Sequence, residues 1–523
     1  MAGYLTRRIL KGILSVVAVL FVVMLLIFSL MNRDLIFASD ASYSKLKSNA
    51  KEAYKMQKWE DYGYLDFVPY SEYLADIFAL GEIDSETYNE ALKFGDTPAS
   101  DNENVKKYVQ SFSEYYKSQG YEITRLNAVK QGSKYREGGQ PRIYAHKNIP
   151  TLTRLIKYIG GIITIDSIHY VKDDIAPRGI TFTLFDPAYG GKRLSPAIMG
   201  CGTKHKYLLY FDSFFPFIHQ NLITVNLGSS YSVNRGTDVF ETMTKPQGEL
   251  KISKVYYPSG AVAESADDIH TLTYVKGSYE NGTLVVKNNF IDDYTLVSVR
   301  RSGLSKIGYS FVIGILSVIL SYALAIPLGL FTANKKGKIA DKLATAYIIF
   351  IIAVPSLAYI FLFKAIGGSL GLPTVFDMQS PTELMYVLPI ISLALPSAAS
   401  LMKWLRRYMI DKEGSDFVKF AKANGFSKGE IFRSHILKNA VIPIIHGIPA
   451  SIFGALVGAI ITERVYVVPG AGNLLTTAIN QYDNGVIIGL TLFYSLLSVA
   501  AAIIADVLIS LVDPRISLSG KRR

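Results

Sequence analysis

Apolar residues are concentrated in six runs, each long enough to cross a bilayer whose hydrocarbon core is about 30 Å thick. The first run, Gly12 to Met31, exceeds the apolar part of a cleaved signal peptide, and no clean Ala-x-Ala site follows it. We therefore interpret it as a retained helix. The other five runs have approximate bounds of Ile307–Thr332, Ala340–Lys364, Leu384–Met402, Val441–Ile461 and Val486–Val512. This pattern predicts an all-α membrane protein with six transmembrane helices.

A long polar stretch, residues 33–302, separates the first run from the second. Its first part, to about Asn127, predicts helices, because it has few Gly or Pro and its apolar residues recur at three- and four-residue spacing. Its later part is rich in Ile and Thr, which favours strands. The expected strands are Gly161–Tyr170, Gly179–Phe185 and Leu272–Val286, the last with a hairpin signal at Asn281-Gly282. The stretch therefore predicts an inserted α+β domain.

Charge is divided unevenly between these parts. The chain has a net charge of +12, yet residues 33–302 contain 32 basic and 32 acidic side chains, so the whole excess accompanies the apolar runs. Basic residues gather before the first run, in alternate connections and in the tail, which predicts cytoplasmic N- and C-termini and an extracellular domain. These residues are Arg7, Arg8, Lys11, Lys335, Lys336, Lys338, Lys342, the region from Lys403 to Lys438, Arg515, Lys521, Arg522 and Arg523. Such a distribution is a topology signal rather than a nucleic-acid-binding surface.

The connection before the fifth run has a distinctive local pattern. Phe417 to Asn424 predicts a short helix that Gly425 ends, and Ser427 with Glu430 forms a capping box for a second helix through Ile436. We call residues 416–443 the elbow. Two short helices joined at a glycine would form a rigid basic lever for a partner; the alternative is a solvated loop with incidental charges.

The sequence has no pattern typical of a catalytic centre. There is no GxxxxGK[ST] phosphate loop, no GxSxG and no HExxH, and the one cysteine, Cys201, cannot form a disulfide within the chain. Prolines in the runs favour helices around a passage, although each could be an ordinary kink. Glu463, Asp483 and Asp506 lie near the last two runs, where a structural ion pair is at least as plausible as a transport role. We expect no catalytic, cofactor or metal site on this chain, and the substrate path stays undefined.

The elbow resembles the cytoplasmic coupling loop of ABC-importer permeases, in particular the peptide-transporter branch. The matching residues are Asp416, Phe417, Val418, Ala421, Ala423, Gly425, His435, Leu437, Asn439, Ala440 and Pro443. Lys419-Phe420-Ala421 stands where that family has Glu-Ala-Ala, and Leu437-Lys438 replaces a Leu-Pro. Other similar segments are Tyr4-Leu5-x-Arg7-Arg8, Val225–Ser230 with Asn226 in place of Asp, Glu463 with Pro469-Gly470-x-Gly472, and Asp513-Pro514-Arg515. The nearest resemblance is to the B-type permease of oligopeptide and Ami-like transporters of Gram-positive bacteria.

The resemblance implies a type I ABC-importer permease in a bacterial plasma membrane. Its partners would be a second homologous permease, two cytoplasmic ABC ATPases that carry ATP and Mg²⁺, a lipid-anchored extracellular peptide-binding protein, membrane lipid and a peptide substrate. The implied ATPase-coupling residues are Asp416, Phe417, Ala421, Ala423, Gly425, Phe426, His435, Leu437, Asn439 and Pro443. The expected divisions are residues 1–32, 33–302, a permease core at 303–518 with its coupling loop at 403–440, and a tail at 519–523.

Three alternatives stay open at this point. A related permease could carry nickel or an opine, since such permeases share the same elbow. The chain could be a membrane receptor whose outside domain senses a ligand. A membrane enzyme is the least favoured, because catalytic residues do not cluster. The inserted domain itself could be a platform for the binding protein, a guard of the outer mouth or a passive insertion.

Overall fold

We describe the protein from a computed structural model. The described residues are 2–38, 40–94, 102–126, 130–131, 134–135, 143–166, 178–186, 191–192, 194–211, 218–250, 252–256, 262–265, 267–274, 294–299, 301–378 and 382–512. The predicted hairpin at Asn281-Gly282 and the basic tail from Arg515 to Arg523 lie outside them. The predicted domain boundaries at residues 33 and 302 stay predictions.

Five long apolar helices could each cross a membrane by length and composition. They are α1 (Ala2–Leu30), α11 (Lys306–Asn334), α14 (Val387–Glu413), α18 (Ile448–Tyr466) and α20 (Asn484–Val512). A sixth candidate is the pair α12 (Ile339–Ala353) and α13 (Ser356–Ser369), which is bent by 113°. The bend falls at Val354-Pro355, where proline cannot continue the helical hydrogen bonds of α12. The predicted runs thus correspond to five candidate spanning helices and one bent pair.

The predicted start of the fifth span, Val441, is wrong. Residues 438–446 form a separate helix, α17 (Lys438–His446), and the spanning helix α18 starts after Gly447. Pro449 lies in the first turn of α18, where its missing N–H costs nothing. Ala440 and Ile444 of α17 are apolar because they belong to the buried cluster that holds the elbow against α11 and α14, so hydropathy alone merged the two helices.

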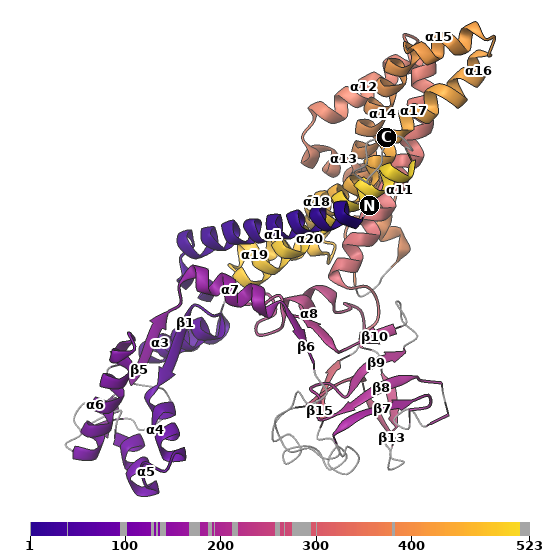
Figure 1. Ribbon diagram of the computed structural model, residues 1–523. Coiled ribbons are helices and arrows are strands. Elements are labelled where there is room, and N and C mark those ends of the chain that lie inside the picture. Colours follow the sequence, from indigo (N-terminus) through magenta and orange to yellow (C-terminus); the bar gives the residue numbers. More distant parts are fainter. Residues whose placement is uncertain are drawn as a thin grey trace.

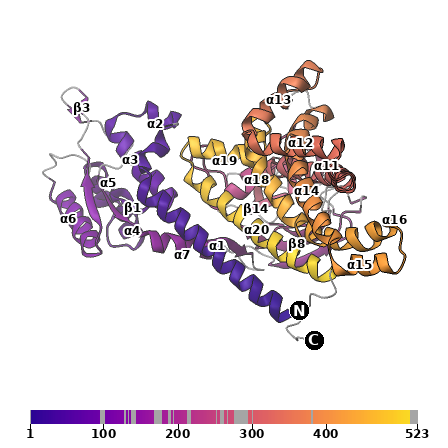
Figure 2. The same ribbon diagram turned by 90° about the horizontal axis from the view of Figure 1, so that it is seen from above.

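Helices α1 and α20 lie side by side and run in opposite directions (Figure 2). Near the start of α1, Gly12 faces Val499 so closely that a Cβ on the glycine would lie 2.4 Å from a Val499 methyl carbon. Arg8 Nε lies 3.0 Å from a carboxylate oxygen of Asp506, and the Tyr4 hydroxyl donates to the same oxygen at 3.0 Å. Asp506 therefore belongs to a structural ion pair, the alternative that the sequence left open.

The segment after α1 forms a mainly helical lobe, as predicted. A 3-10 helix (Arg33–Phe37) leads into α2 (Ala41–Lys45), α3 (Ser48–Asp61), α4 (Tyr70–Ala79), α5 (Ser85–Phe94) and α6 (Glu103–Ser118). These helices pack on an antiparallel sheet of order β1-β5-β2, formed by Leu65–Pro69, Ile143–Asn148 and Glu122–Arg125. Lys130–Gln131 (β3) pairs with Lys134–Tyr135 (β4). Aromatic side chains fill this lobe, among them Trp59, Tyr64, Tyr70 and Phe112.

The next segment forms a second lobe of strands, and its status as the β-rich part of an inserted domain stays a prediction. After α7 (Thr151–Gly161) come β6 (Ile163–Ile165), β7 (Gly179–Thr183), β8 (Ala197–Cys201), β9 (Tyr207–Phe211), β10 (Ile218–Gln220) and β11 (Ile223–Val225). The main sheet has the antiparallel order β10-β9-β8-β7, and β11 pairs with β6. Helix α8 (Val239–Thr244) precedes two further pairs, β12 (Ser253–Tyr256) with β13 (Val262–Ser265) and β14 (Asp267–Tyr274) with β15 (Tyr294–Val299).

Both lobes lie on the opposite side of the long helices from the elbow (Figure 1). The elbow contains α15 (Asp416–Ala423), α16 (Lys428–Ile431), a π-helical turn (Phe432–Leu437) and α17. Helix α19 (Ala471–Asn480) and a 3-10 helix (Glu383–Tyr386) complete the described helices. One hydrophobic core joins the second half of α1, α19 and the start of α20 to Leu155, Leu227 and Met243 of the inserted segment. The inserted segment therefore packs directly against the membrane helices and is not connected to them by a linker alone.

Candidate functional site

The elbow has the local structure that its sequence predicts. Helix α15 ends before Gly425, whose φ of +80° lies in the left-handed region that favours glycine. Ser427 then caps α16: its side chain accepts from the Glu430 N–H at 3.3 Å, and Glu430 accepts from the Ser427 N–H at 2.9 Å. Hydrogen bonds from Ser427 also lower the pKa of Glu430. The two helices therefore meet at a fixed angle set by one glycine and one capping box.

Apolar side chains fix the inner face of the elbow to the long helices. Val418, Ile431 and Ile436 are buried against Leu405 and Met409, which lie near the end of α14. Partly buried residues at the end of α11, including Leu330 and Ala333, complete this cluster. Movement of the elbow would therefore be transmitted directly to α11 and α14.

The outer face of the elbow presents aromatic rings and lysines to the surroundings. Phe420 is 73% exposed and Phe426 is 49% exposed, and Phe417 is 37% exposed. Lys419 and Lys422 flank these rings along α15 and are also exposed. Exposed aromatic side chains among charges are typical of protein–protein contact sites.

The predicted coupling residues all lie in the elbow, but they differ in how far they are buried. Ala421 is buried, whereas Asp416, Phe417, Ala423, Gly425, Phe426 and Pro443 are exposed, and His435, Leu437 and Asn439 are intermediate. The ring of Phe426 contacts His435 edge-on at 5.8 Å between centroids. Asn439 donates from its side-chain amide to the His435 carbonyl at 2.7 Å, which supports the π-helical turn. Phe420, the most exposed ring of α15, was not among the predicted residues.

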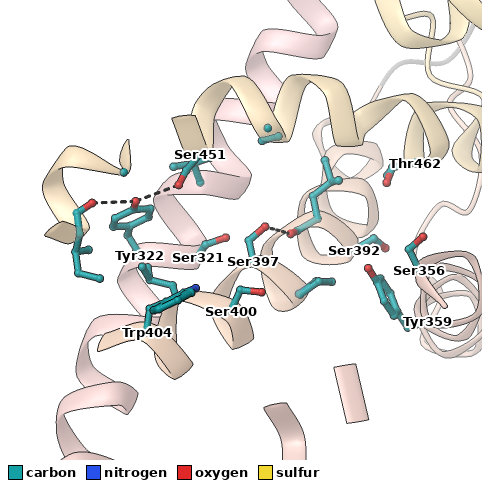
Figure 3. Close-up of a pocket in the computed structure, with 18 of the residues that line it drawn as sticks. Ser321, Tyr322, Ser356, Tyr359, Ser392, Ser397, Ser400, Trp404, Ser451 and Thr462 are labelled. Carbon is teal, nitrogen blue, oxygen red and sulfur yellow. Dashed lines mark hydrogen bonds between the residues drawn. The ribbon is translucent and has the colours of Figure 1, made fainter. Parts of the chain in front are cut away.

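A cavity of about 580 Å³ lies between α11, α13, α14, α17 and α18. Its polar lining consists mainly of hydroxyl groups (Figure 3), and aromatic and aliphatic side chains form the rest of its wall. The hydroxyl residues are Ser321, Tyr322, Ser356, Tyr359, Ser392, Ser397, Ser400, Tyr408, Ser451 and Thr462, with Trp404 beside them. None of the residues that the structure describes along this cavity is charged.

Helix α14 connects this cavity to the elbow. Leu393, Pro396, Ser397, Ser400 and Trp404 recur at three- and four-residue spacing and face the cavity, while Leu405 and Met409 lie under the elbow. This helical periodicity of serines in an apolar run was visible in the sequence, and it could have indicated the substrate path. The cavity and the elbow thus share one rigid element.

A second joint ties the inserted segment to the start of α20. The Asp483 carboxylate is fully buried and accepts from the backbone N–H groups of Tyr231, Ser232 and Val233 at 2.8–2.9 Å. The Ser230 hydroxyl donates to it at 2.6 Å. Only glycine fits beside this joint at residue 485, because a Cβ there would lie 2.0 Å from the Ser229 carbonyl oxygen. We call residues 229–233 with Asp483 the outer joint.

Glu463 forms a similar buried contact at the end of α18. Its carboxylate accepts from the Ser310 hydroxyl at 2.5 Å and from the Asn473 N–H, in the first turn of α19, at 2.9 Å. A carboxylate at a helix N-terminus is stabilised by the free N–H groups and the helix dipole. Among the described residues neither Glu463 nor Asp483 pairs with a cation, and both serve as hydrogen-bond acceptors that join segments.

Comparisons with known proteins agree with this architecture. The family described as "Binding-protein-dependent transport system inner membrane component" matches residues 325–518. The oligopeptide transport system permease protein AmiC of Streptococcus pneumoniae is 32% identical over 529 residues, covering 100% of this chain and 99% of that protein. The dipeptide transport system permease protein DppB of Bacillus subtilis is 29% identical over 213 residues, covering 40% of this chain and 68% of that protein.

One similar solved structure is an inward-facing conformation of the MetNI methionine ABC transporter. It has a TM-score of 0.33 and 12% sequence identity, and the match covers 39% of this chain and 93% of that chain.

The match to AmiC extends over essentially the whole length of both chains, so it includes the inserted segment as well as the core. Together with the apolar helices, it identifies a multi-pass membrane protein whose relatives are transport permeases. The chain belongs to the ABC-importer permeases of the oligopeptide and dipeptide branch.

Proposed function

We propose that this chain is one permease half of an ATP-driven importer of oligopeptides. A second homologous permease would complete the passage, and two cytoplasmic ABC ATPases would bind ATP and Mg²⁺ and carry out hydrolysis. The relatives' names, oligopeptide and dipeptide permeases, support this substrate class. The neutral lining of the cavity, made of hydroxyl groups and of aromatic and aliphatic side chains, also suits peptides with varied side chains, because it discriminates against neither charge.

The observation that supports this proposal most directly is that α14 belongs both to the cavity wall and to the contact with the elbow. One end of α14 lies under the elbow, and its preceding turns line the cavity. An ATPase that binds Phe420 and Phe426 and moves the elbow would therefore displace the cavity wall. ATP must bind the closed ATPase dimer more tightly than the open one for this displacement to occur.

The proposed orientation has both termini and the elbow in the cytoplasm and residues 33–302 outside a bacterial plasma membrane. The basic residues before α1, after α11 and within the elbow support it. The contact between Arg8 and Asp506 also brings the start of α1 and the end of α20 to one side.

The inserted segment would be a platform for a lipid-anchored peptide-binding protein. In the sheet β10-β9-β8-β7, one face exposes Phe182 (65%), Phe211 (50%) and Leu209 (40%). Apolar side chains in such a row mark a contact surface for another protein.

Two glycines on the proposed cytoplasmic side provide the test. Gly425→Val places a β-branched residue at φ +80°, which costs at least about 1–2 kcal/mol and changes the angle between α15 and α16. In proteoliposomes with all subunits, we expect Gly425→Val to retain basal ATP hydrolysis and lose most peptide uptake. The matched control, Gly337→Val, strains a φ of +79° in the connection between α11 and α12, outside the elbow, and should retain uptake. Equal uptake by both variants and wild type would contradict the coupling role.

A further inference from the structure

A second cavity, of about 550 Å³, lies between the elbow and the ends of two long helices. Its walls come from the end of α11 and the turn after it, the last turns of α14, and α15 and α16 with the π-helical turn. The elbow forms the end of the molecule farthest from both lobes (Figure 1). None of the described residues that line this cavity also lines the serine-lined cavity, so the two are distinct. We call it the elbow cavity.

Lysines from three separate segments line the elbow cavity. Lys336 follows α11, Lys422 lies near the end of α15, and Lys428 starts α16. Among the described residues, no carboxylate lies within ion-pair distance of these three lysines. Glu413 of α14 also lines the cavity, but it is paired with none of them. Like charges around one concave space raise the local positive potential, so the cavity attracts anionic groups.

The carboxylates of the elbow, and the one that follows Lys336 in the sequence, are engaged elsewhere. Asp416 is paired with Lys419 at 2.9 Å, and Glu430 caps the first turn of α16. Asp341 accepts two hydrogen bonds from Arg406, at 2.7 and 2.9 Å. The described part of the chain therefore leaves the anionic partner of the elbow cavity to another molecule.

The floor of the elbow cavity is apolar and lies outside the hydrocarbon layer on α14. Val418, Ile431 and Met409 line the cavity and are buried. On α14 the cavity begins at Met409, about 10 Å beyond Met402, where the predicted apolar run ends. An acidic side chain that enters from the proposed cytoplasmic side would lay its methylene groups on this floor and its carboxylate against the lysines.

The elbow cavity and the exposed aromatic rings lie on opposite faces of α15. Lys422 shares a face with Val418, four residues earlier, and Phe420 lies on the other face. A partner that contacts both faces must therefore enclose the tip of the elbow, where Phe426 and Lys428 follow the turn between the two helices. The surface that fits is a groove with apolar side chains on one wall and carboxylates on the other.

We propose that the elbow cavity receives carboxylate side chains of the ATPase, so that the ATPase that fits this permease is acidic where it faces Lys336, Lys422 and Lys428. This inference rests on the proposed function and adds the chemistry of its partner. Charged groups at an interface increase the association rate and the specificity, and their contribution falls as salt rises. The positive-inside bias accounts for lysines on this side of the membrane, but it does not direct lysines from three segments to one cavity.

Titration of the full-length permease in detergent with the purified ATPase of its transporter tests this contact. Lys336→Glu places a carboxylate in the cavity, and we expect about tenfold weaker binding. The matched control is Lys338→Glu, because Lys338 is exposed in the same connection but does not line the cavity. It should bind the ATPase like wild type.

The other two lysines and the salt dependence sharpen the test. Lys422→Glu and Lys428→Glu should also weaken binding, and Lys336→Gln, which only removes the charge, should weaken it less than Lys336→Glu. All three lysines are exposed, so these changes remove no buried contact within the chain. The affinity of wild type should fall between about 0.05 M and about 0.5 M KCl, and Lys336→Glu should make this fall smaller.

Two results would overturn the proposal directly: equal affinity of Lys336→Glu and wild type, or an affinity that does not depend on salt. The proposal is also wrong if the lysine variants lose bound phosphatidylglycerol in native mass spectrometry but bind the ATPase like wild type, since the cavity then holds an anionic lipid. Normal ATPase binding by the lysine variants together with loss of uptake in Gly425→Val would overturn only the acidic contact and leave the proposed function in place. Failure of wild type to bind the ATPase would overturn both.

Discussion

The elbow and the outer joint both attach a non-spanning segment to the spanning helices, but they do so by opposite means. The elbow is anchored by apolar side chains such as Val418 and Ile436, and its outer face stays exposed. The outer joint is a buried carboxylate, Asp483, that satisfies three backbone N–H groups. Apolar contacts are non-directional, so the elbow and the helices packed on it can shift together without breaking a hydrogen bond, whereas hydrogen bonds in a buried site fix one geometry. The comparison indicates that the elbow is suited to transmit movement and that the outer joint is suited to hold position.

Removing the Asp483 carboxylate should give the largest effect. Asp483→Ala leaves the N–H groups of Tyr231, Ser232 and Val233 buried without an acceptor, and each such group costs about 1–3 kcal/mol. We expect little folded protein in membranes, measured as the monodisperse fraction after solubilisation. The comparison variant is Asp506→Ala at the other end of α20, whose pair with Arg8 is partly exposed and worth about 0–1 kcal/mol. Equal yields of the two variants would contradict a fixed outer joint.

Truncating Phe420 should affect coupling without affecting folding. Phe420 is 73% exposed, so Phe420→Ala removes little buried surface within the chain. If the Phe420 ring is an aromatic anchor for the ATPase, its removal should weaken the binding of the ATPase by about tenfold. Titration of purified ATPase against the permease in detergent measures this affinity. Phe240→Ala on α8, 39% exposed on the lobe side, serves as the control and should change nothing. An unchanged affinity for Phe420→Ala would remove this face as the contact.

Acidification should produce the smallest effect, confined to the lobe of strands. Burial lowers the pKa of His205 below its usual 6.5, although Asp166 opposes the shift. The folded lobe therefore binds fewer protons than the unfolded chain, and its stability should fall as pH decreases through about 6.5. Below the lowered pKa the loss should level off. Hydrogen exchange of β8 and β9 between pH 7.5 and 5 measures this change. His205→Gln should remove the pH dependence, and an identical pH dependence in that variant would exclude His205 as its source.

Local sequence signals predicted the elbow and the spanning helices well. The geometry of the elbow is determined by residues close together in the sequence, namely Gly425, Ser427 and Glu430, so their pattern could be recognised directly. The runs of apolar residues identified the spans for the same reason. The predicted start of α18 is wrong because Ala440 and Ile444 are apolar for packing within the elbow's own buried cluster rather than for lipid contact.

Contacts between distant residues could not be predicted in this way. Asp483 was noted as an acidic residue near a span, but its partner Ser230 is 253 residues away. Arg154 and Phe28 likewise meet only because α7 returns to the end of α1. The serines along α14 carried a helical period that could have been recognised, but the other walls of their cavity come from four separate helices.

The most direct test of the central claim is peptide accumulation in proteoliposomes made with the isolated chain and with the complete set of subunits. We predict ATP-dependent uptake by the complete transporter, its loss in Gly425→Val, and no accumulation by the isolated chain. Accumulation of peptide by the isolated chain, or undiminished uptake by the Gly425→Val transporter, would contradict it.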